Sequence, residues 1–196
     1  MKKLKKFVIA STLALTMIGF QQPTDAATVH HVQNGDTLWL LGKKYGVSVL
    51  ELKKVNNKST NVLRIGEKLV IPESITPYEK DLLARLVHAE AKGEPYAGKV
   101  AVATVVLNRV DHPDFPNTVK DVIYEVSGGS YAFTPVQNGT INKPADAESY
   151  RAVNEALAFR GLGNGSLYFY NPDKISSSWV LSRNVTLTIG NHVFAK

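Results

Sequence analysis

A single carboxylate near the middle of the chain has the surroundings of a general acid. Glu90 follows Leu83, Leu86 and Val87 at helical spacing, which predicts that it lies on the apolar stripe of a helix. Apolar neighbours raise the pKa of a carboxyl group because desolvation penalises the anion, and glycosidic bond cleavage uses such a protonated acid. The spacing equally allows a Glu at a helix end that turns towards solvent, so both interpretations stay open.

Cleavage of a glycosidic bond by water requires a second carboxylate. It would lie roughly 5–5.5 Å from the first in a retaining enzyme and roughly 6.5–9.5 Å away in an inverting one. Glu94 is nearest in sequence, but Gly93 and Pro95 put it beyond the helix end, where it could equally cap the following helix. The other candidates lie further along the chain: Asp111, Asp114, Glu125 and Asp121, the last spaced as a capping partner of Thr118.

The composition excludes several other kinds of site. The chain of 196 residues has no cysteine, so it contains no disulfide, no thiolate nucleophile and no Cys-ligated zinc. Its five histidines lack metal-ligand spacing, no Gly-x-Ser-x-Gly element is present, and no cofactor is expected. The net charge of +6 lies in the first 74 residues, whereas residues 75–196 carry twelve basic and twelve acidic residues. This larger part lacks the basic excess that nucleic-acid binding requires.

The N-terminus has the pattern of a secretory signal peptide over residues 1–26. Four lysines precede an apolar run from Phe7 to Phe20, and Ala26 is the preferred cleavage site after a small-residue exit. The apolar run is short for a membrane span, with a retained anchor as the alternative. We therefore expect a secreted protein whose mature form has no membrane span.

Residues 29–73 are predicted to form a small β-α-α-β unit. Its elements are, in order, a strand over Val29–Val32, a helix capped by Asp36 or Thr37 and ended by Gly46, a helix capped by Ser48 with Glu51 as capping-box partner, and a strand over Lys68–Ile71. Pro72 closes the unit, and residues 74–77 form a short linker to the rest of the chain.

This unit resembles a LysM module along nearly its whole length. The shared positions include Val32, Gly35-Asp36-Thr37-Leu38, Tyr45, Val47, Leu52, Asn56, Gly66, Leu69 and Ile71-Pro72. LysM modules hold glycans that contain N-acetylglucosamine, in a groove between the loop after the first strand and the loop before the second. The resemblance implies glycan contacts from Gly35, Asp36, Thr37, Leu38, Leu63 and Ile65, although several of these could instead only shape the fold.

Residues 78–196 are predicted to form a larger α+β domain with most of its helices first. Thr76 and Glu79 make a capping box with Pro77 at the first helical position, so a helix is expected to about Lys92. The later segments are a helix over Tyr96–Val110, a loop over 111–116, a short helix over Thr118–Val126 ended by Gly128-Gly129, an irregular stretch over 127–144, a helix over Asp146–Phe159, and β segments at Leu167–Tyr170, Val185–Ile189 and His192–Phe194.

The larger domain resembles the catalytic domain of germination-type spore cortex-lytic enzymes and related cell wall hydrolases. The matching motifs are Ala89-Glu90-Ala91, Gly93-Glu94-Pro95-Tyr96, Leu107-Asn108-Arg109-Val110, Leu167-Tyr168-Phe169-Tyr170-Asn171-Pro172 and Ile189-Gly190-Asn191-His192-Val193-Phe194. These enzymes are related to lysozyme-like lytic transglycosylases, in which one Glu at a helix end carries the reaction. The resemblance implies a mainly helical lysozyme-like domain with a small C-terminal β element. It also implies that Glu90 protonates the oxygen between N-acetylmuramic acid and N-acetylglucosamine and then deprotonates the C6 hydroxyl, which closes a 1,6-anhydro ring.

Six polar or aromatic residues of this domain are suited to lining a sugar cleft. They are Thr134, Tyr168, Tyr170, Asn171, Trp179 and His192, and for each aromatic one core packing is the competing explanation. The resemblance implies peptidoglycan as the partner, in the wall or spore of a Gram-positive spore-forming bacterium, and leaves room for an unidentified spore or wall protein. The alternative functions are a non-catalytic peptidoglycan-binding wall or coat protein and a murein hydrolase that uses water.

Overall fold

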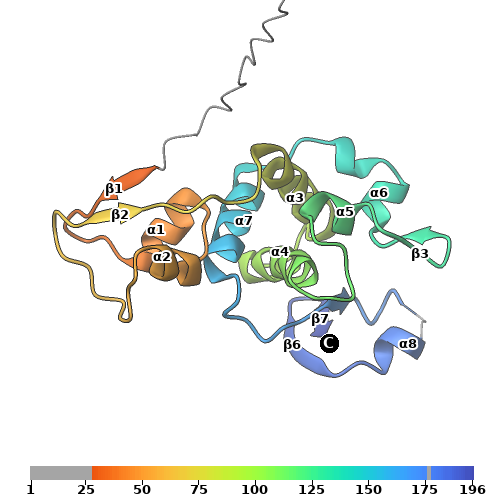
Figure 1. Cartoon of the computed structure of the whole chain (residues 1–196). Coiled ribbons are helices and arrows are strands. Elements are labelled where there is room, and N and C mark those ends of the chain that lie inside the picture. The colour runs from red at the N-terminus through yellow and green to blue at the C-terminus, as the bar shows by residue number, and fades with distance from the viewer. Residues whose placement is uncertain (1–27, 176–177) are drawn as a thin grey trace, which may run out of the picture.

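The structure is a computed structural model that describes residues 28–175 and 178–196. The predicted signal peptide over residues 1–26 and its cleavage site lie outside the described residues. A small N-terminal module and a larger domain pack side by side in one body (Figure 1). None of the helices within the described ranges has both the length and the apolar run needed to cross a bilayer.

The N-terminal module has the predicted order of elements. They are β1 (Val29–His31), α1 (Leu38–Tyr45), α2 (Val49–Val55) and β2 (Lys68–Val70), and β1 pairs antiparallel with β2. Thr37 caps α1 by accepting a hydrogen bond from the backbone N–H of Leu40, and Gly46 ends the helix in the left-handed conformation at φ 66°. The module has its own core of buried apolar side chains, which are Val32, Leu38, Leu41, Val47, Val49, Leu52, Leu69 and Ile71.

The capping box predicted for α2 is only half formed: Ser48 caps the helix, but Glu51 does not take part. The Ser48 hydroxyl accepts from the backbone N–H of Leu50 as expected. The Glu51 carboxylate, however, lies exposed and pairs with Lys54, with 3.4 Å between Oε1 and Nζ. Ser48 Oγ instead donates to the carbonyl oxygen of Arg160 in the larger domain, at 3.1 Å. The cap therefore also joins the two parts of the chain.

The larger domain is mainly helical, with its three-stranded sheet at the C-terminal end. Its helices are α3 (Pro77–Glu90), α4 (Tyr96–Val110), α5 (Val119–Ile123), α6 (Thr134–Gln137), the 3-10 helix η1 (Thr140–Asn142), α7 (Ala147–Phe159) and α8 (Ser178–Leu181). Its strands are β3 (Val126–Ser127), β4 (Ser130–Tyr131), β5 (Tyr168–Tyr170), β6 (Val185–Ile189) and β7 (His192–Ala195). The bounds of α4 and β6 match the prediction, and the Thr76–Glu79 capping box of α3 is confirmed.

Two predictions for the middle of the domain are wrong. Residues Gly128 and Gly129 do not end a helix; with φ of 60° and 83° they form the turn of the β3–β4 hairpin. Residues 127–144, predicted as irregular, contain β4, α6 and η1. Each of these elements has four residues or fewer, so none is long enough to show a hydrophobic period.

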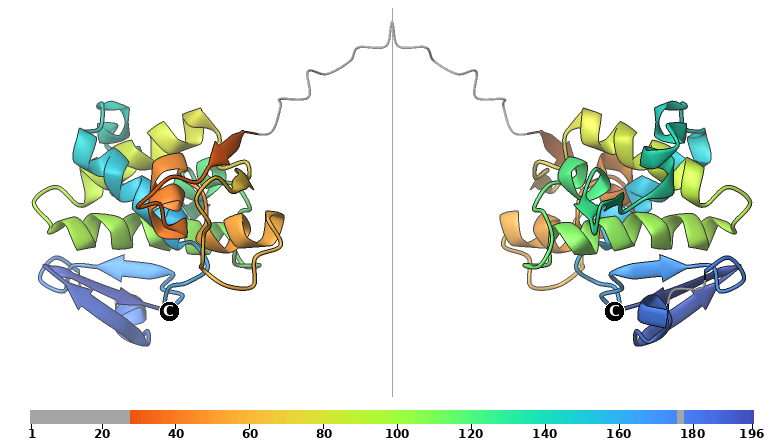
Figure 2. Two further views of the ribbon diagram at one scale, coloured as in Figure 1. Left: turned by 90° about the vertical axis from the view of Figure 1, so that its left-hand side faces the viewer. Right: turned by 90° about the vertical axis from the view of Figure 1, so that its right-hand side faces the viewer.

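The helices pack around α4 and α7, and the sheet forms a separate layer against α4 (Figure 2). The core contains the fully buried Leu83, Leu86 and Val87 of α3 together with apolar side chains of α4, α5 and α7. In the sheet β7 lies between β5 and β6, and its Phe194 is fully buried in the same core. Arg109 in the last turn of α4 donates through Nε to the carbonyl of Leu167 at 2.7 Å, which fixes the helix to the start of the sheet.

The N-terminal module is docked on the larger domain through α1 and α7. A Cβ at Gly42 of α1 would lie 3.0 Å from Cβ of Ala158, so the two helix backbones approach closely where the glycine lacks a side chain. Lys43 pairs with Glu155 at 2.7 Å beside this crossing. Trp39 meets Phe159 edge to face with 6.2 Å between ring centroids. The α6 helix and the β3–β4 hairpin lie at the far side of the domain from the module (Figure 1).

Candidate active site

A cavity of about 680 Å³ opens between the last turn of α3, α6, η1 and the strands β5 and β7. Its wall brings together segments separated by up to about a hundred residues, because the sheet returns the C-terminus to α3. The lining side chains are His88, Ala89, Glu90, Lys92, Arg109, Ala132, Phe133, Thr134, Pro135, Asn138, Thr140, Lys143, Phe169, Tyr170, Asn171, Lys174, Ile175 and His192. The wall contains both apolar side chains and polar groups that can fix the orientation of a ligand.

Glu90 is the last residue of α3 and faces this cavity. The preceding apolar residues of its stripe are fully buried, which holds the carboxyl group at the edge of the core rather than in solvent. Burial raises the pKa of Glu90 to about 7 from the usual 4.5. Within the described residues no hydrogen bond to this carboxyl group is formed, so nothing offsets its desolvation. Glu90 therefore points neither fully into the core nor out to solvent: its carboxyl group is half-buried in the wall of a cavity.

Glu94 lies only four residues further on but is held in a different way. Its Oε2 accepts from the backbone N–H of Asn191 at 3.0 Å, and its Oε1 accepts from Asn191 Nδ2 at 3.1 Å. The contact requires Gly190 in the β6–β7 turn, since a Cβ there would lie 2.2 Å from Oε2. The suggestion that Glu94 caps α4 is wrong, because Pro95 is the capping position and has no side-chain hydrogen bond. Glu94 ties the α3–α4 turn to the sheet.

The other carboxylates considered as second catalytic groups do not line the cavity. Asp111 pairs with Arg160 through both oxygens, with Nε–Oδ2 at 2.9 Å and Nη2–Oδ1 at 2.6 Å. Asp121 Oδ2 accepts from the hydroxyl of Thr118 at 2.7 Å, and the backbone N–H of Asp121 donates to the same hydroxyl oxygen. Asp121 is therefore the capping partner that its spacing predicts. Asp114 and Glu125 are likewise absent from the wall. Among the residues that the structure describes, Glu90 is the one carboxylate of the cavity.

The structure brings four of the six predicted sugar-contacting residues to this wall. They are Thr134, Tyr170, Asn171 and His192. Tyr168 and Trp179 lie outside it and pack against each other edge to face at 5.2 Å between centroids. The guanidinium of Arg183 stands over both rings, at 4.9 Å and 4.4 Å. Tyr168 and Trp179 therefore form a separate aromatic cluster, and Trp179 remains 54% exposed.

His192 of β7 is one of two buried polar side chains of the cavity wall, the other being Arg109. It is 8% exposed and packs on Phe169, and burial lowers the pKa of its imidazole while the nearby charge of Glu94 opposes the shift. Its Nδ1 has no hydrogen-bond partner among the described residues. Because Nδ1 is buried as well as unpaired, the other ring nitrogen, Nε2, is the one left to donate to or accept from a sugar in the cavity, depending on the tautomer.

The sequence reasoning missed several residues of the wall. His88 lies two positions before Glu90 and so on another face of the helix, yet it lines the cavity because the site lies at the helix end, where several faces are accessible. Lys92, Lys143 and Lys174 lie in connecting segments without a motif. In the described parts of the chain no group of three His, Asp or Glu side chains is arranged to hold a metal ion.

In the N-terminal module the two predicted groove segments have different kinds of contact. Asp36 accepts from Nε2 of His30 at 2.7 Å and from the N–H of Gln33 at 2.8 Å, Thr37 caps α1, and Leu38 lies in the core. These three residues shape the fold. Gly35 is exposed in the turn with φ of 88°, and Ile65 is 73% exposed.

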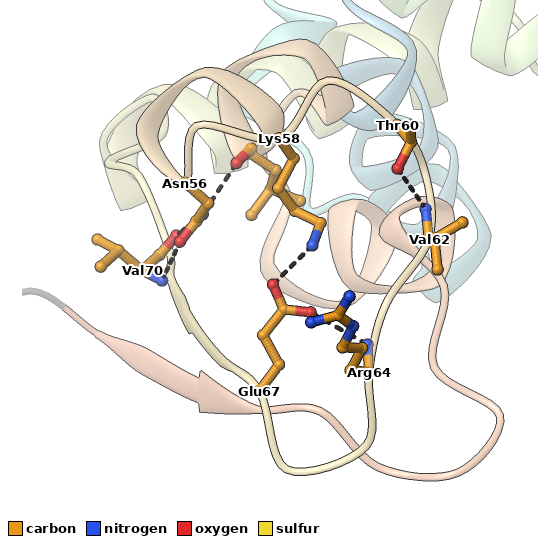
Figure 3. Close-up of polar contacts among 8 residues, drawn as sticks. Asn56, Lys58, Thr60, Val62, Arg64, Glu67 and Val70 are labelled. Atoms are coloured by element: carbon orange, nitrogen blue, oxygen red, sulfur yellow. Dashed lines mark hydrogen bonds and ion pairs between the residues drawn. The ribbon is translucent and has the colours of Figure 1, made fainter.

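The loop before β2 is fixed by side chains at its two ends (Figure 3). Asn56 donates to the carbonyls of Leu52 and Val70 and accepts from the N–H of Val70, each at 2.8 Å. Glu67 accepts from Lys58 Nζ at 2.6 Å and from the N–H of Arg64 at 3.0 Å. The loop therefore presents its exposed apolar residues, Val62 and Ile65, in a set conformation. Leu63 is partly buried against the core of the module.

Comparison with known proteins assigns both parts of the chain. The cell wall hydrolase family matches residues 93–195, and the LysM domain family matches residues 30–72. The chain therefore belongs to the cell wall hydrolase family and carries a LysM domain at its N-terminal side. The family match begins just after Glu90, so the case for this residue rests on the geometry of the cavity and on the resemblance of the surrounding motif.

The relatives are more specific than the family. A spore cortex-lytic enzyme of Halalkalibacterium halodurans is 41% identical over 124 residues, which are 63% of this chain and 36% of that protein. One of Bacillus cereus is 38% identical over 151 residues, which are 77% of this chain and 53% of that protein. The chain thus spans between about a third and a half of the length of these relatives.

Two solved structures match the larger domain. The catalytic domain of the germination-specific lytic transglycosylase SleB from Bacillus anthracis is 38% identical with a TM-score of 0.58, and the match covers 64% of this chain and all of that one. The catalytic domain of Bacillus cereus SleB is 39% identical with a TM-score of 0.56, covering 64% and 95%. The larger domain therefore has the fold of the SleB catalytic domain.

Proposed function

We propose that this protein cleaves the glycan strands of peptidoglycan as a lytic transglycosylase, with Glu90 as its general acid and base. The observation that carries this proposal is the one carboxylate that the described residues place in the cavity, whose raised pKa of about 7 keeps it mainly protonated in mildly acidic solution and partly protonated at neutral pH. The names of the relatives, spore cortex-lytic enzyme and germination-specific lytic transglycosylase, agree with this chemistry.

The reaction needs no water and no second carboxylate. The Glu90 carboxyl group protonates the oxygen between C1 of N-acetylmuramic acid and C4 of N-acetylglucosamine, and the C1–O bond breaks. The resulting Glu90 carboxylate takes the proton of the C6 hydroxyl, whose oxygen attacks C1 and closes the 1,6-anhydro ring. The carboxyl group is protonated again at the end, as microscopic reversibility requires. The cavity wall offers Thr134, Asn171 and His192 as hydrogen-bonding groups for the sugars.

The LysM domain is proposed to hold the same polymer. Its support is the fixed loop before β2, which exposes Val62 and Ile65 as apolar cover for sugar faces, together with the exposed turn at Gly35. The remaining sequence-based expectation, export after cleavage at Ala26, would bring both sites to the wall or the spore.

Analysis of the products tests the proposal directly. The mature protein is incubated with purified sacculi and, separately, with isolated spore cortex, and released muropeptides are identified by mass spectrometry. We expect 1,6-anhydro-muramic ends from the wild type and none from Glu90→Gln. New reducing ends that depend on Glu90 would assign a hydrolase instead. If wild type and Glu90→Gln release no fragments but bind the polymer equally, the protein is a binding protein.

A further inference from the structure

The aromatic cluster beside the cavity presents a tryptophan to solvent. The cluster consists of Tyr168 at the start of β5, Trp179 of α8 and Arg183, whose guanidinium lies over both rings. Trp179 is 54% exposed, although the large apolar surface of a tryptophan is usually mostly buried. The contacts with Tyr168 and Arg183 leave more than half of the indole surface open to a ligand.

The short helix α8 holds Trp179 in a set position. The next residue, Val180, is buried with Tyr170 in a small core between the helix and the sheet. The Ser182 hydroxyl donates to the carbonyl of Trp179 at 2.8 Å, and the backbone N–H of Arg183 donates to the carbonyl of Val180 at 3.2 Å. A ligand that stacks on the indole ring therefore loses little binding free energy to the ordering of this side chain.

The aromatic cluster is continuous with the wall of the cavity. Arg109 lines the cavity, and its guanidinium lies 5.2 Å from the ring centroid of Phe133, another residue of the wall. The same guanidinium lies 5.6 Å from the ring centroid of Tyr168. Tyr170 belongs both to the wall and to the small core that anchors α8. A row of rings and guanidinium groups thus leads from the cavity to Trp179 at the surface.

The proposed substrate is longer than the cavity. A volume of about 680 Å³ is that of a pocket for one small molecule, whereas a glycan strand continues in both directions from the bond placed at Glu90. Sugars beyond the cavity must therefore pass over the surface of the domain. Sugar rings have apolar faces of C–H groups, which the faces of aromatic rings can cover. Nucleic acid also stacks on aromatic rings, but the equal numbers of basic and acidic residues in 75–196 disfavour it as the ligand.

We propose that Trp179, supported by Tyr168 and Arg183, is an outer glycan subsite on which a sugar of the strand beyond the cavity stacks. This inference rests on the proposed function and adds to it a preference for long strands. The occupant is the same glycan strand that enters the cavity, because the row of rings begins in the cavity wall. The LysM domain does not cover the subsite, since it lies at the opposite side of the larger domain from α8 (Figure 1).

Trp179→Ala should slow the cleavage of long strands and spare short ones. Loss of the apolar contact with one sugar face should reduce kcat/KM about five- to thirtyfold on strands that reach the aromatic cluster. A strand that ends within the cavity cannot reach Trp179, so the variant should cleave it as fast as the wild type does. Trp179→Tyr keeps an aromatic face and should keep most of the preference for long strands.

The test measures kcat/KM of the wild type and Trp179→Ala on glycan strands that are solubilised from isolated spore cortex and separated by length. The ratio of the variant to the wild-type value at each length cancels the number of cleavable bonds and the contribution of the LysM domain, which both proteins share. We expect a ratio near one at the shortest length that the wild type cleaves. The ratio should fall with length and level off once the strand spans both the cavity and Trp179.

A matched control removes another exposed aromatic side chain. Tyr78 is 52% exposed and lies in the first turn of α3, at the opposite end of that helix from Glu90, so Tyr78→Ala should give a ratio of one at every length. A ratio for Trp179→Ala that is the same at all lengths, whether near one or uniformly reduced, would overturn the proposal and leave the proposed function intact. If the folded wild type cleaves no strand of any length, the proposed function itself fails, and the outer subsite with it.

Discussion

Two carboxylates on either side of Gly93 have opposite environments. Glu90 ends α3 at the edge of the core, and burial alone raises its pKa to about 7. Glu94 lies past the turn and accepts two hydrogen bonds from Asn191, which hold its pKa below the usual value despite some desolvation. The same residue type is thus still partly protonated at neutral pH in one place and ionised in the other.

The difference shows what suits one carboxylate to acid–base chemistry and the other to a structural role. A hydrogen-bonded anion stabilises the fold but makes a poor acid, because the protein favours its charged form. A desolvated carboxyl group without donors costs folding free energy at neutral pH, yet it can give up and regain a proton during a reaction. We therefore expect substitutions at the two positions to have opposite effects on activity and on stability.

The largest expected difference is in the rate of glycan cleavage. Glu90→Gln keeps the size of the side chain but removes its acid, and general acid–base catalysis contributes about 10²- to 10⁴-fold to a rate. We expect a loss in this range for Glu90→Gln and a change of a few fold at most for Glu94→Gln. Release of soluble fragments from sacculi at equal protein concentration measures both. Equal losses in the two variants would remove the distinction drawn here.

Stability should change in the opposite direction at Glu90. A folded-state pKa of about 7 lies above the unfolded value of 4.5, so the folded protein is favoured below pH 4.5 and loses that advantage as pH rises towards 7. Removing the ionisable group should raise the free energy of unfolding by about 3 kcal/mol at pH 8. Urea unfolding of wild type and Glu90→Gln at pH 8 and pH 4 checks this, and the gain should vanish at pH 4. A gain that is independent of pH would point to packing instead of desolvation.

The pH dependence of activity should follow the same group. Only protonated Glu90 can act as the acid, so kcat/KM should fall about tenfold per pH unit above a pKa of about 7. The assay uses soluble glycan oligomers over pH 5–9. Glu94→Gln should show the same alkaline limb, and binding of the inactive Glu90→Gln to sacculi should be measured in parallel. If binding of Glu90→Gln falls with pH in the same way as kcat/KM of the wild type, the titrating group controls substrate binding and not the acid step.

The smallest expected effect concerns the tie between Glu94 and the sheet. Asn191→Ala removes the side-chain donor but keeps the backbone N–H, and a net hydrogen bond contributes about 1 kcal/mol. Because the pKa of Glu94 is lowered in the fold, its contribution is present above pH 4.5 and is lost as pH falls through the folded pKa. Thermal or urea unfolding should show a penalty at pH 7 that decreases at pH 3. A constant penalty would mean that the amide stabilises the turn without the charge.

The sequence predicts the long elements and the position of Glu90 well, since both depend on local periodicity. The helix over Tyr96–Val110 and the caps at Thr37 and Thr76 follow from neighbours within four residues. The role of Glu94 could not be predicted, because its partner Asn191 is 97 positions away. The three lysines of the cavity wall, Lys92, Lys143 and Lys174, could not be predicted for a similar reason, because they lie in connecting loops from three separate parts of the chain and no local pattern indicates that they share one cavity.

The contact between α1 and α7 has a consequence for how the two halves work together. When a binding module hangs on a flexible tether, its benefit depends on an effective concentration that falls slowly as the tether lengthens. Here the LysM domain is not on a flexible tether, because Gly42 packs against Ala158 and Lys43 pairs with Glu155. The distance from the LysM loops to the cavity is consequently fixed by the packing of the two parts of the chain. If the LysM domain binds the proposed glycan polymer, that polymer would meet the cavity at one fixed distance from the LysM loops.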